Sequence, residues 1–151
     1  PLGPGVIDAP IGRDPRDRKR MAVTEKNSRE AVTHWEVITR YGQYTHLRCR
    51  LETGRTHQIR VHMAYTHHPV VGDPLYGRVA TAKARNRNAA EHSEMGLDRQ
   101  FLHSWRLSFE HPITGEELSF TDMPCDDLQM ILDELAPRSM GRTDYGHELL
   151  G

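Results

Sequence analysis

Two neighbouring segments near the middle of the chain alternate between hydrophobic and polar residues. AVTHWEVITR at 31–40 alternates with a period of two, is rich in β-branched and aromatic residues, and carries apolar side chains on both faces. This pattern favours a strand over a helix. YTHLRCRLE at 44–52 alternates apolar residues with a mainly basic side, which indicates an amphipathic strand. Because Tyr-Gly-Gln at 41–43 can form a turn, we expect a long antiparallel hairpin.

Two other segments have the features of helices. Strict alternation ends after Gly54, and HQIRVHMAY is bounded by Thr56, which can serve as an N-cap, and by the helix-stopping Pro69. We therefore predict a short helix at about 56–66. The segment DDLQMILDELAP at 126–137 predicts an amphipathic helix whose inward face carries Leu128, Ile131, Leu132 and Leu135.

The remaining segments are shorter or less regular. The extended pieces are expected at 6–11, 20–25 and 101–112, with a turn at 113–115 and a hairpin partner at 116–124. The basic segment 13–20 is expected to be a loop between strands. Segments expected to lack fixed structure are a leader or linker at 1–5, a mobile loop or weak helix at 79–100, and a disordered tail at 138–151.

These elements predict an α+β fold with a mixed, mostly antiparallel sheet and a few flanking helices. A chain of 151 residues with 36% hydrophobic residues can form one domain with a modest core. No apolar run approaches the ~20 residues needed to cross a bilayer, and the N-terminus lacks a signal-peptide pattern. Cys49 and Cys125 lack disulfide or metal-ligand spacing, so we expect free thiols in a soluble protein of the cytoplasm.

Charge is divided unevenly along the chain. Residues 1–60 hold 12 Lys and Arg against 7 Asp and Glu, whereas residues 61–151 hold 8 against 14. The N-terminal part is therefore the candidate surface for a polyanion, and its densest basic stretch is RDPRDRKR at 13–20. Either this loop is a solvated segment, or it contacts a phosphate backbone through Arg16, Arg18, Lys19 and Arg20.

The segment GRTHQIRVH at 54–62 places arginines, histidines and a glutamine at a strand-to-helix junction, where backbone N–H groups and the helix dipole favour an anion. A phosphate or carboxylate is expected beside Arg55, His57, Gln58 and Arg60. The alternative is that both arginines lie on a helix surface and that His57 and His62 are satisfied polar groups. Ten histidines are present, but none shows the spacing of a metal site, so we expect no metal ion.

Four blocks of the sequence together resemble RNA pseudouridine synthases of the RluA/RluD type. The blocks are APIGRDPRDRKRMAV at 9–23, LETGRTHQIRVHM at 51–63, HPVVGDPLYG at 68–77 and FLHSWRLSFEHPITG at 101–115. They follow the family's order and roughly its spacing. The resemblance runs over most of 6–135. It implies that 6–137 is the C-terminal part of a synthase catalytic domain, which is incomplete in this chain.

The resemblance implies isomerisation of uridine to pseudouridine in RNA, without a cofactor or metal. A nucleophilic aspartate acts on a uridine that is flipped out of its stack. The family's HRLD-type block, which holds this aspartate, and the following block with a base-stacking tyrosine are not present in this sequence. Asp14 lies in the later basic loop and is followed by Pro15, so it is not a match for the nucleophile.

The same resemblance implies that Arg60 forms an ion pair that holds the catalytic aspartate. Leu102 resembles the family's apolar residue that lines the base pocket; the alternative is an ordinary core residue of a strand. The weaker candidates for phosphate or ribose contacts are Arg55, His57 and Gln58. Asp73 and Tyr76 are expected to hold a turn rather than to react, because Gly-Asp-Pro favours turns.

The preferred interpretation is therefore a fragment of a bacterial-type pseudouridine synthase that acts on RNA, with large-subunit rRNA as the expected substrate. The fragment is expected to be inactive because it lacks the nucleophile. The alternatives are an RNA-binding module without catalysis and an interaction domain without an RNA role. Strands that would pair with the missing part leave open edges, so the chain is expected to self-associate or to be held by a close partner.

Overall fold

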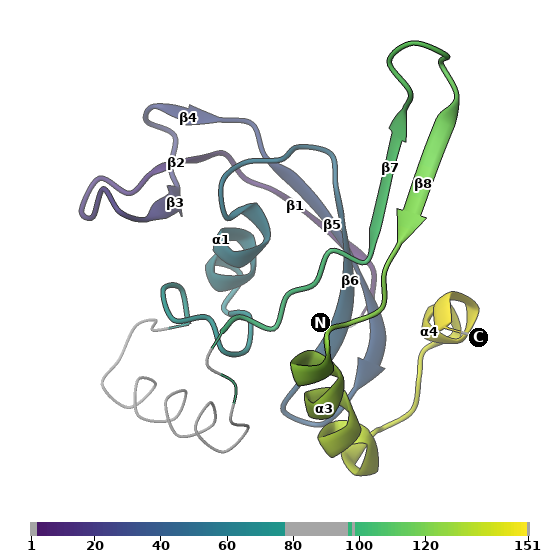
Figure 1. Ribbon diagram of the computed structural model, residues 1–151. Helices are drawn as coiled ribbons and strands as arrows, with labels where there is room; N and C mark the ends of the chain where they lie inside the picture. The colour runs from purple at the N-terminus through teal and green to yellow at the C-terminus, as the bar shows by residue number, and fades with distance from the viewer. Residues whose placement is uncertain (1–2, 78–96, 98, 151) are drawn as a thin grey trace.

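The computed structural model describes residues 3–77, 97 and 99–150. Every strand pair among these residues is antiparallel, and helices flank the sheets, which confirms the predicted α+β class (Figure 1). The elements in chain order are β1 (Gly5–Asp8), β2 (Ile11–Arg13), β3 (Met21–Val23), β4 (Ser28–Arg29), β5 (Val32–Arg40), β6 (Thr45–Leu51), α1 (Gln58–Tyr65), β7 (Arg106–Glu110), β8 (Glu117–Thr121), α3 (Asp126–Leu135), η1 (Ala136–Arg138) and α4 (Asp144–Leu150).

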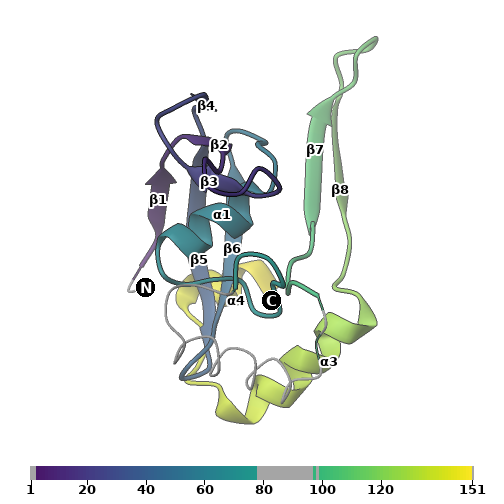
Figure 2. The ribbon, with the colours of Figure 1, turned by 90° about the vertical axis from the view of Figure 1, so that its left-hand side faces the viewer.

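The predicted central hairpin is confirmed as β5 and β6, which pair along their length with an irregularity between Val37 and Thr39. β1 pairs with the other edge of β5, so the strand order is β1-β5-β6. Figures 1 and 2 place α1 across one face of this sheet. Side chains from this face and from α1 form one core cluster, which includes Ile7, Ala9, Met63, Trp35, Leu47 and Cys49.

The single strand expected at 6–11 is wrong, because the structure divides it between two sheets. β1 pairs with β5, whereas β2 pairs with β3 and β4. Pro10 lies between them, and proline has no N–H to continue a ladder. The backbone changes sheets there, with the Ala9 N–H bonded to the Ala31 carbonyl and the Pro10 carbonyl accepting from Thr24. The loop expected between the following strands is confirmed at 14–20.

The short helix expected after Gly54 is confirmed as α1, but its predicted N-cap is wrong. His57, not Thr56, precedes the first helical residue, and it has a left-handed backbone with φ 54° and no capping hydrogen bond from its side chain. This turn is closed by the Gln58 N–H, which donates to the Arg55 carbonyl at 3.0 Å. The left-handed residue turns the chain before the helix, so the Thr56 side chain is not placed at the helix start.

The C-terminal amphipathic helix is confirmed as α3, and three of its four predicted inward residues, Leu128, Ile131 and Leu135, are buried. Leu132 is only partly buried. The buried face packs with Leu97 and with the partly buried Tyr41 and Tyr44 at the turn of the β5–β6 hairpin. Most of the loop expected at 79–100 lies outside the described residues.

The tail at 138–151 was expected to be disordered, and through residue 150 the structure corrects this expectation. β1 pairs with β5 only as far as Trp35, which leaves the same edge open near the end of β5. Residues 140–143 occupy that edge: the Met140 N–H donates to the Arg40 carbonyl and the Thr143 N–H donates to the Ile38 carbonyl. α4 follows, with Gly146 so close that a Cβ there would lie 2.3 Å from the Ile38 carbonyl oxygen.

The strand expected at 101–112 is shorter than predicted, because it begins only at Arg106, but its hairpin partner is confirmed. β7 and β8 form a two-stranded sheet that projects away from the other elements in both views (Figures 1 and 2). Alternation places four apolar side chains on one face of it: Leu107, Phe109, Leu118 and Phe120. Three of them are more than two-fifths exposed, namely Leu107, Phe109 and Phe120.

Candidate functional site

A buried ion pair lies where α1 meets the segment that follows it. Arg60, in the first turn of α1, donates from Nε to Asp73 Oδ2 at 2.8 Å and from Nη2 to Oδ1 at 2.9 Å. The Asp73 side chain is fully buried and the Arg60 side chain is 11% exposed. A two-pronged contact of this kind fixes the plane of both groups and is stronger than a hydrogen bond between neutral groups.

Asp73 also holds its own turn, as the Gly-Asp-Pro sequence led us to expect. Its Oδ1 accepts hydrogen bonds from the backbone N–H groups of Leu75 and Tyr76, at 2.9 and 3.0 Å. Gly72 has φ 77°, and a Cβ there would lie 2.0 Å from the Arg99 carbonyl oxygen, so only glycine fits. The turn thereby presents to Arg60 a carboxylate of the kind that the sequence analysis expected beside it, from Asp73, which the sequence analysis had not named as the partner.

Tyr76 connects this ion pair to the N-terminal strands. Its side chain is almost fully buried, and the guanidinium carbons of Arg60 and Arg20 lie 5.0 and 5.2 Å from the centre of its ring. Its hydroxyl oxygen accepts a hydrogen bond from the Met21 N–H at 3.0 Å and lies 2.9 Å from His57 Nδ1. The expectation that Tyr76 holds a turn is therefore too narrow, because it also packs against two cations.

The charges around the pair shift two pKa values. Burial opposes ionisation of Asp73, but the hydrogen bonds from Arg60, Tyr76 and Leu75 outweigh it, so the pKa of Asp73 is lowered. Partial burial lowers the pKa of His57, and the nearby Arg60 lowers it further, against a smaller opposing effect of Asp73. Asp73 is thus held as a carboxylate and His57 as a neutral ring near neutral pH.

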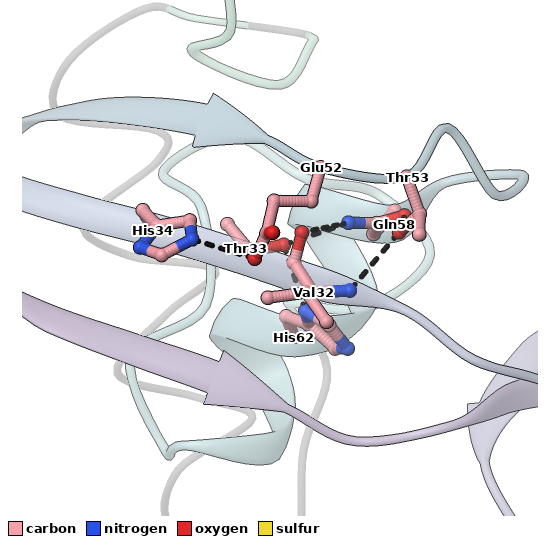
Figure 3. Close-up of polar contacts among 7 residues, drawn as sticks. All are labelled: Val32, Thr33, His34, Glu52, Thr53, Gln58 and His62. Carbon is pink, nitrogen blue, oxygen red and sulfur yellow. Dashed lines mark hydrogen bonds and ion pairs between the residues drawn. The ribbon is translucent and has the colours of Figure 1, made fainter.

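Gln58 does not have the free amide that an RNA contact would require, which corrects its predicted role. Its Nε2 donates to the Val32 carbonyl and to Thr33 Oγ1, and its Oε1 accepts from Thr53 Oγ1 and the Arg55 N–H. These four bonds use its full hydrogen-bonding capacity. With 3% exposure, Gln58 instead ties α1 to β5 (Figure 3).

His62 belongs to the same buried network. Its Nδ1 lies 2.8 Å from Thr33 Oγ1 and its Nε2 lies 2.9 Å from the Ala9 carbonyl, so the ring joins α1 to β5 and to the β1–β2 connection. Because a carbonyl can only accept, Nε2 carries the hydrogen and Nδ1 accepts from Thr33. Burial lowers the pKa of His62. The alternative that His62 is a satisfied polar group is therefore confirmed.

The basic loop separates into two kinds of residue. Of the four basic side chains that were predicted to contact phosphate, those of Arg16, Arg18 and Lys19 are exposed. Arg20 is partly buried against Tyr76, and its Nε is a buried atom for which the described residues provide no hydrogen-bond acceptor. Asp14 and Asp17 accept backbone N–H bonds from Arg16 and Lys19, so both aspartates hold the loop.

The other predicted site residues do not join this cluster through a described contact. Arg55 donates from Nε to the Glu30 carbonyl at 2.7 Å, which directs its side chain toward the β4–β5 connection. Leu102 is partly exposed and lies before β7; the adjacent Phe101 N–H donates to the Val71 carbonyl, near the Asp73 turn. Among the described residues, no group of three or more His, Cys, Asp or Glu could hold a metal ion.

No helix in the described part of the chain is long and apolar enough to span a membrane.

The sequence analysis missed two features of the site, namely that Asp73 is the partner of Arg60 and that the ring of Tyr76 packs against Arg60 and Arg20. Asp73 lies thirteen residues after Arg60, beyond the reach of any helical spacing rule. The available signal was that Gly-Asp-Pro places a carboxylate in a tight turn close behind a helix that has an inward arginine.

Comparison with known proteins finds similar proteins over most of this chain. Residues 3–65 match the model of the RNA pseudouridylate synthase family. The chain is 46% identical over 131 residues to ribosomal large subunit pseudouridine synthase D of Xanthomonas campestris pv. campestris, which covers 87% of this chain and 39% of that protein. It is also 46% identical to the protein of that name from Vibrio cholerae, covering 93% of this chain and 43% of that protein.

A solved structure titled Human RNA Pseudouridylate Synthase Domain Containing 1 has a TM-score of 0.63 and 23% identity, and the match covers 89% of this chain and 58% of that one. This likeness concerns the fold alone. The chain spans about two fifths of the length of the two bacterial relatives.

Proposed function

Because this chain is related to the RluA/RluD-type pseudouridine synthases and spans only part of their length, we propose that it is a segment of an RNA pseudouridine synthase. The longer protein would convert uridine to pseudouridine, and the relatives' names suggest large-subunit rRNA as the substrate. The main support for this proposal is the 46% identity to the Xanthomonas campestris synthase over 87% of this chain. We place the longer protein in the cytoplasm, because the proposed substrate is rRNA and because Cys49 and Cys125 are free thiols.

The reaction needs a nucleophilic carboxylate that the longer protein would supply. The carboxylate attacks the nucleoside, the bond between C1′ and N1 of uridine breaks and the base rotates. C1′ then bonds to C5, the carboxylate is released, the C5 hydrogen leaves as a proton, and N1 takes up a proton, so no atom is gained or lost overall. Arg60 has a part in this scheme because its contacts with Asp73 use Nε and Nη2. In this proposal Nη1 binds the nucleophile, and the positive charge of Arg60 keeps that carboxylate ionised.

RNA contact is proposed for the exposed side chains of the basic loop. Arg16, Arg18 and Lys19 lie in solvent on a loop whose backbone is fixed by Asp14 and Asp17. Phosphate contacts of this kind position the RNA without reading its sequence. Leu102 and Arg55 remain proposed contacts of the base pocket and of the RNA, respectively, because each is partly exposed.

The test compares this 151-residue chain with the longer protein on an unmodified large-subunit rRNA transcript labelled with tritium at C5 of uridine. We expect tritium release by the longer protein and none by the chain alone. Turnover by the chain alone would contradict the assignment of the nucleophile to the missing part. An inactive longer protein that still binds the transcript would favour the second candidate, an RNA-binding module, which the intact and exposed basic loop supports.

A further inference from the structure

Tyr76 makes more contacts with the Arg60 site than a turn residue requires. Its backbone N–H donates to Asp73 Oδ1, while its ring lies 5.0 Å from the guanidinium carbon of Arg60. The same residue therefore contacts both members of the buried ion pair. It is 2% exposed, so water does not compete for the ring face.

The hydroxyl of Tyr76 is fixed at both of its hydrogen-bonding positions. The Met21 N–H at the start of β3 donates to the oxygen at 3.0 Å, and His57 Nδ1 lies 2.9 Å away. His57 also makes an edge contact with the ring, at 5.6 Å between centroids. A neutral His57 can accept the hydroxyl hydrogen at Nδ1, which completes the hydrogen bonding of the group.

The geometry of the ion pair shows what the ring adds. Two parallel bonds from Nε and Nη2 to one carboxylate hold an edge of the guanidinium, but they allow the plane to tilt about that edge. A ring packed against the guanidinium opposes this tilt, and cation–π attraction contributes about 0.5–2 kcal/mol. The direction of the remaining nitrogen, Nη1, is then set by Tyr76.

We propose that Tyr76 is a positioning residue, which holds the guanidinium of Arg60 at the orientation that the isomerisation requires. This inference rests on the proposed function. The hydroxyl contacts with Met21 and His57 hold the ring of Tyr76 in place, and the ring in turn holds the guanidinium of Arg60. The turn at 73–76 thereby affects the rate of the reaction.

The test is a double-mutant cycle in the longer protein, with tritium release from C5-labelled large-subunit rRNA transcript as the assay. We expect Tyr76→Leu to lower kcat by about 10–100-fold with KM nearly unchanged, because misplacement of about 1 Å can have an effect of this size. Tyr76→Phe keeps the ring and should lose less. In an Arg60→Ala background, Tyr76→Leu should cause no further loss, because its effect passes through Arg60. Tyr65→Phe, at an exposed tyrosine of α1, should match the unmodified protein.

An equal fold-loss from Tyr76→Leu in both backgrounds would overturn the proposal, since a general effect on folding would not depend on Arg60. If the Leu variant does not fold, the same cycle with Tyr76→Phe decides. An inactive longer protein would refute the proposed function; the positioning claim is then decided by NMR of the Arg60 Nε–H in this chain. Faster hydrogen exchange of that group in Tyr76→Leu, which removes the ring, supports the claim, and unchanged exchange overturns it.

Discussion

Arg60 and Asp73 lie thirteen residues apart, and their contact brings two opposite charges together in the interior. Burying such a pair gains little net free energy, because desolvation of both ions opposes their attraction. Removing one partner is different, since the other charge is left buried without compensation. A substitution of either Arg60 or Asp73 should therefore destabilise the contact between α1 and the turn that follows it, whatever part the ion pair has in the reaction.

We accordingly expect Arg60→Ala to lower the free energy of unfolding of this chain by about 3–5 kcal/mol, and Asp73→Ala by a similar amount. The double variant should lose clearly less than the two single losses combined, because neither charge is then left alone. Denaturation by urea, followed by circular dichroism, measures all three. Strict additivity of the two losses would mean that the ion pair does not exist in solution.

The buried His62 predicts how stability depends on pH. Its pKa is lowered by burial, so its folded value lies below the unfolded value of 6.5. Above that value both states are neutral and the contribution of His62 to stability is complete. Below it the unfolded state binds a proton first, so the free energy of unfolding decreases by up to about 1.4 kcal/mol per pH unit until the folded pKa is reached.

Unfolding measured in steps from pH 7.5 to pH 5.5 should show this decrease, with His46 and His57 adding to it because their pKa values are also lowered. His62→Gln should be less stable throughout and should show a shallower dependence on pH. An identical pH profile in that variant would exclude His62 as a source of the effect.

At the scale of elements, the sequence predicted the helices and strands correctly where the local pattern of apolar and polar residues decides the structure. The β5–β6 hairpin follows from the period-two alternation of its two strands, and α3 follows from its amphipathic pattern, whose apolar side is buried. The division at Pro10 and the ordered tail could not be predicted this way. Both depend on which edge of β5 is vacant, and that is a property of the assembled sheet. The same holds for Asp73, whose partner is supplied by a separate element.

The β7–β8 hairpin has an apolar face that nothing in the described structure covers. Exposed Phe109 and Phe120 stack on one another at 6.0 Å, beside Leu107. We expect this chain to self-associate through that face, because exposed apolar strands readily pair with other chains. Sedimentation velocity at several protein concentrations measures the degree of self-association.

Replacing Leu107 and Phe120 by threonine should shift the chain toward monomer without lowering its melting temperature, since neither side chain is buried. Met130→Thr and Met140→Thr, which alter exposed apolar residues elsewhere, serve as the matched control. A monomeric unmodified chain at all concentrations would contradict the prediction.

At the scale of the whole molecule, charge separates the two halves more clearly than any single residue does. The excess of basic residues before Arg60 includes the exposed loop, and the acidic excess follows it. Arg20 was grouped with the loop by sequence, but its contact with Tyr76 places it beside the ion pair. Contact with RNA phosphates is therefore expected from three of the four predicted side chains, namely Arg16, Arg18 and Lys19.

If each of these three neutralises one phosphate, binding of this chain to single-stranded RNA should weaken with added salt. On a double-logarithmic plot the slope should be about −0.7 per contact, or roughly −2 for the three. Alanine at all three positions should flatten the slope by that amount and leave the fold intact, because the side chains are exposed. The same substitution at Arg106, Arg138 and Arg142 removes equal charge from exposed positions in the C-terminal half. That control should change the slope much less, which distinguishes direct phosphate contact by the loop from a general effect of net charge.

Arg60→Ala should also leave the slope nearly unchanged, because its guanidinium is bound to Asp73. Fluorescence anisotropy across a salt series measures all of these slopes. An unaltered slope in the loop variant would exclude the loop as an RNA contact, and a large change in Arg60→Ala would mean that this arginine binds phosphate instead of carboxylate.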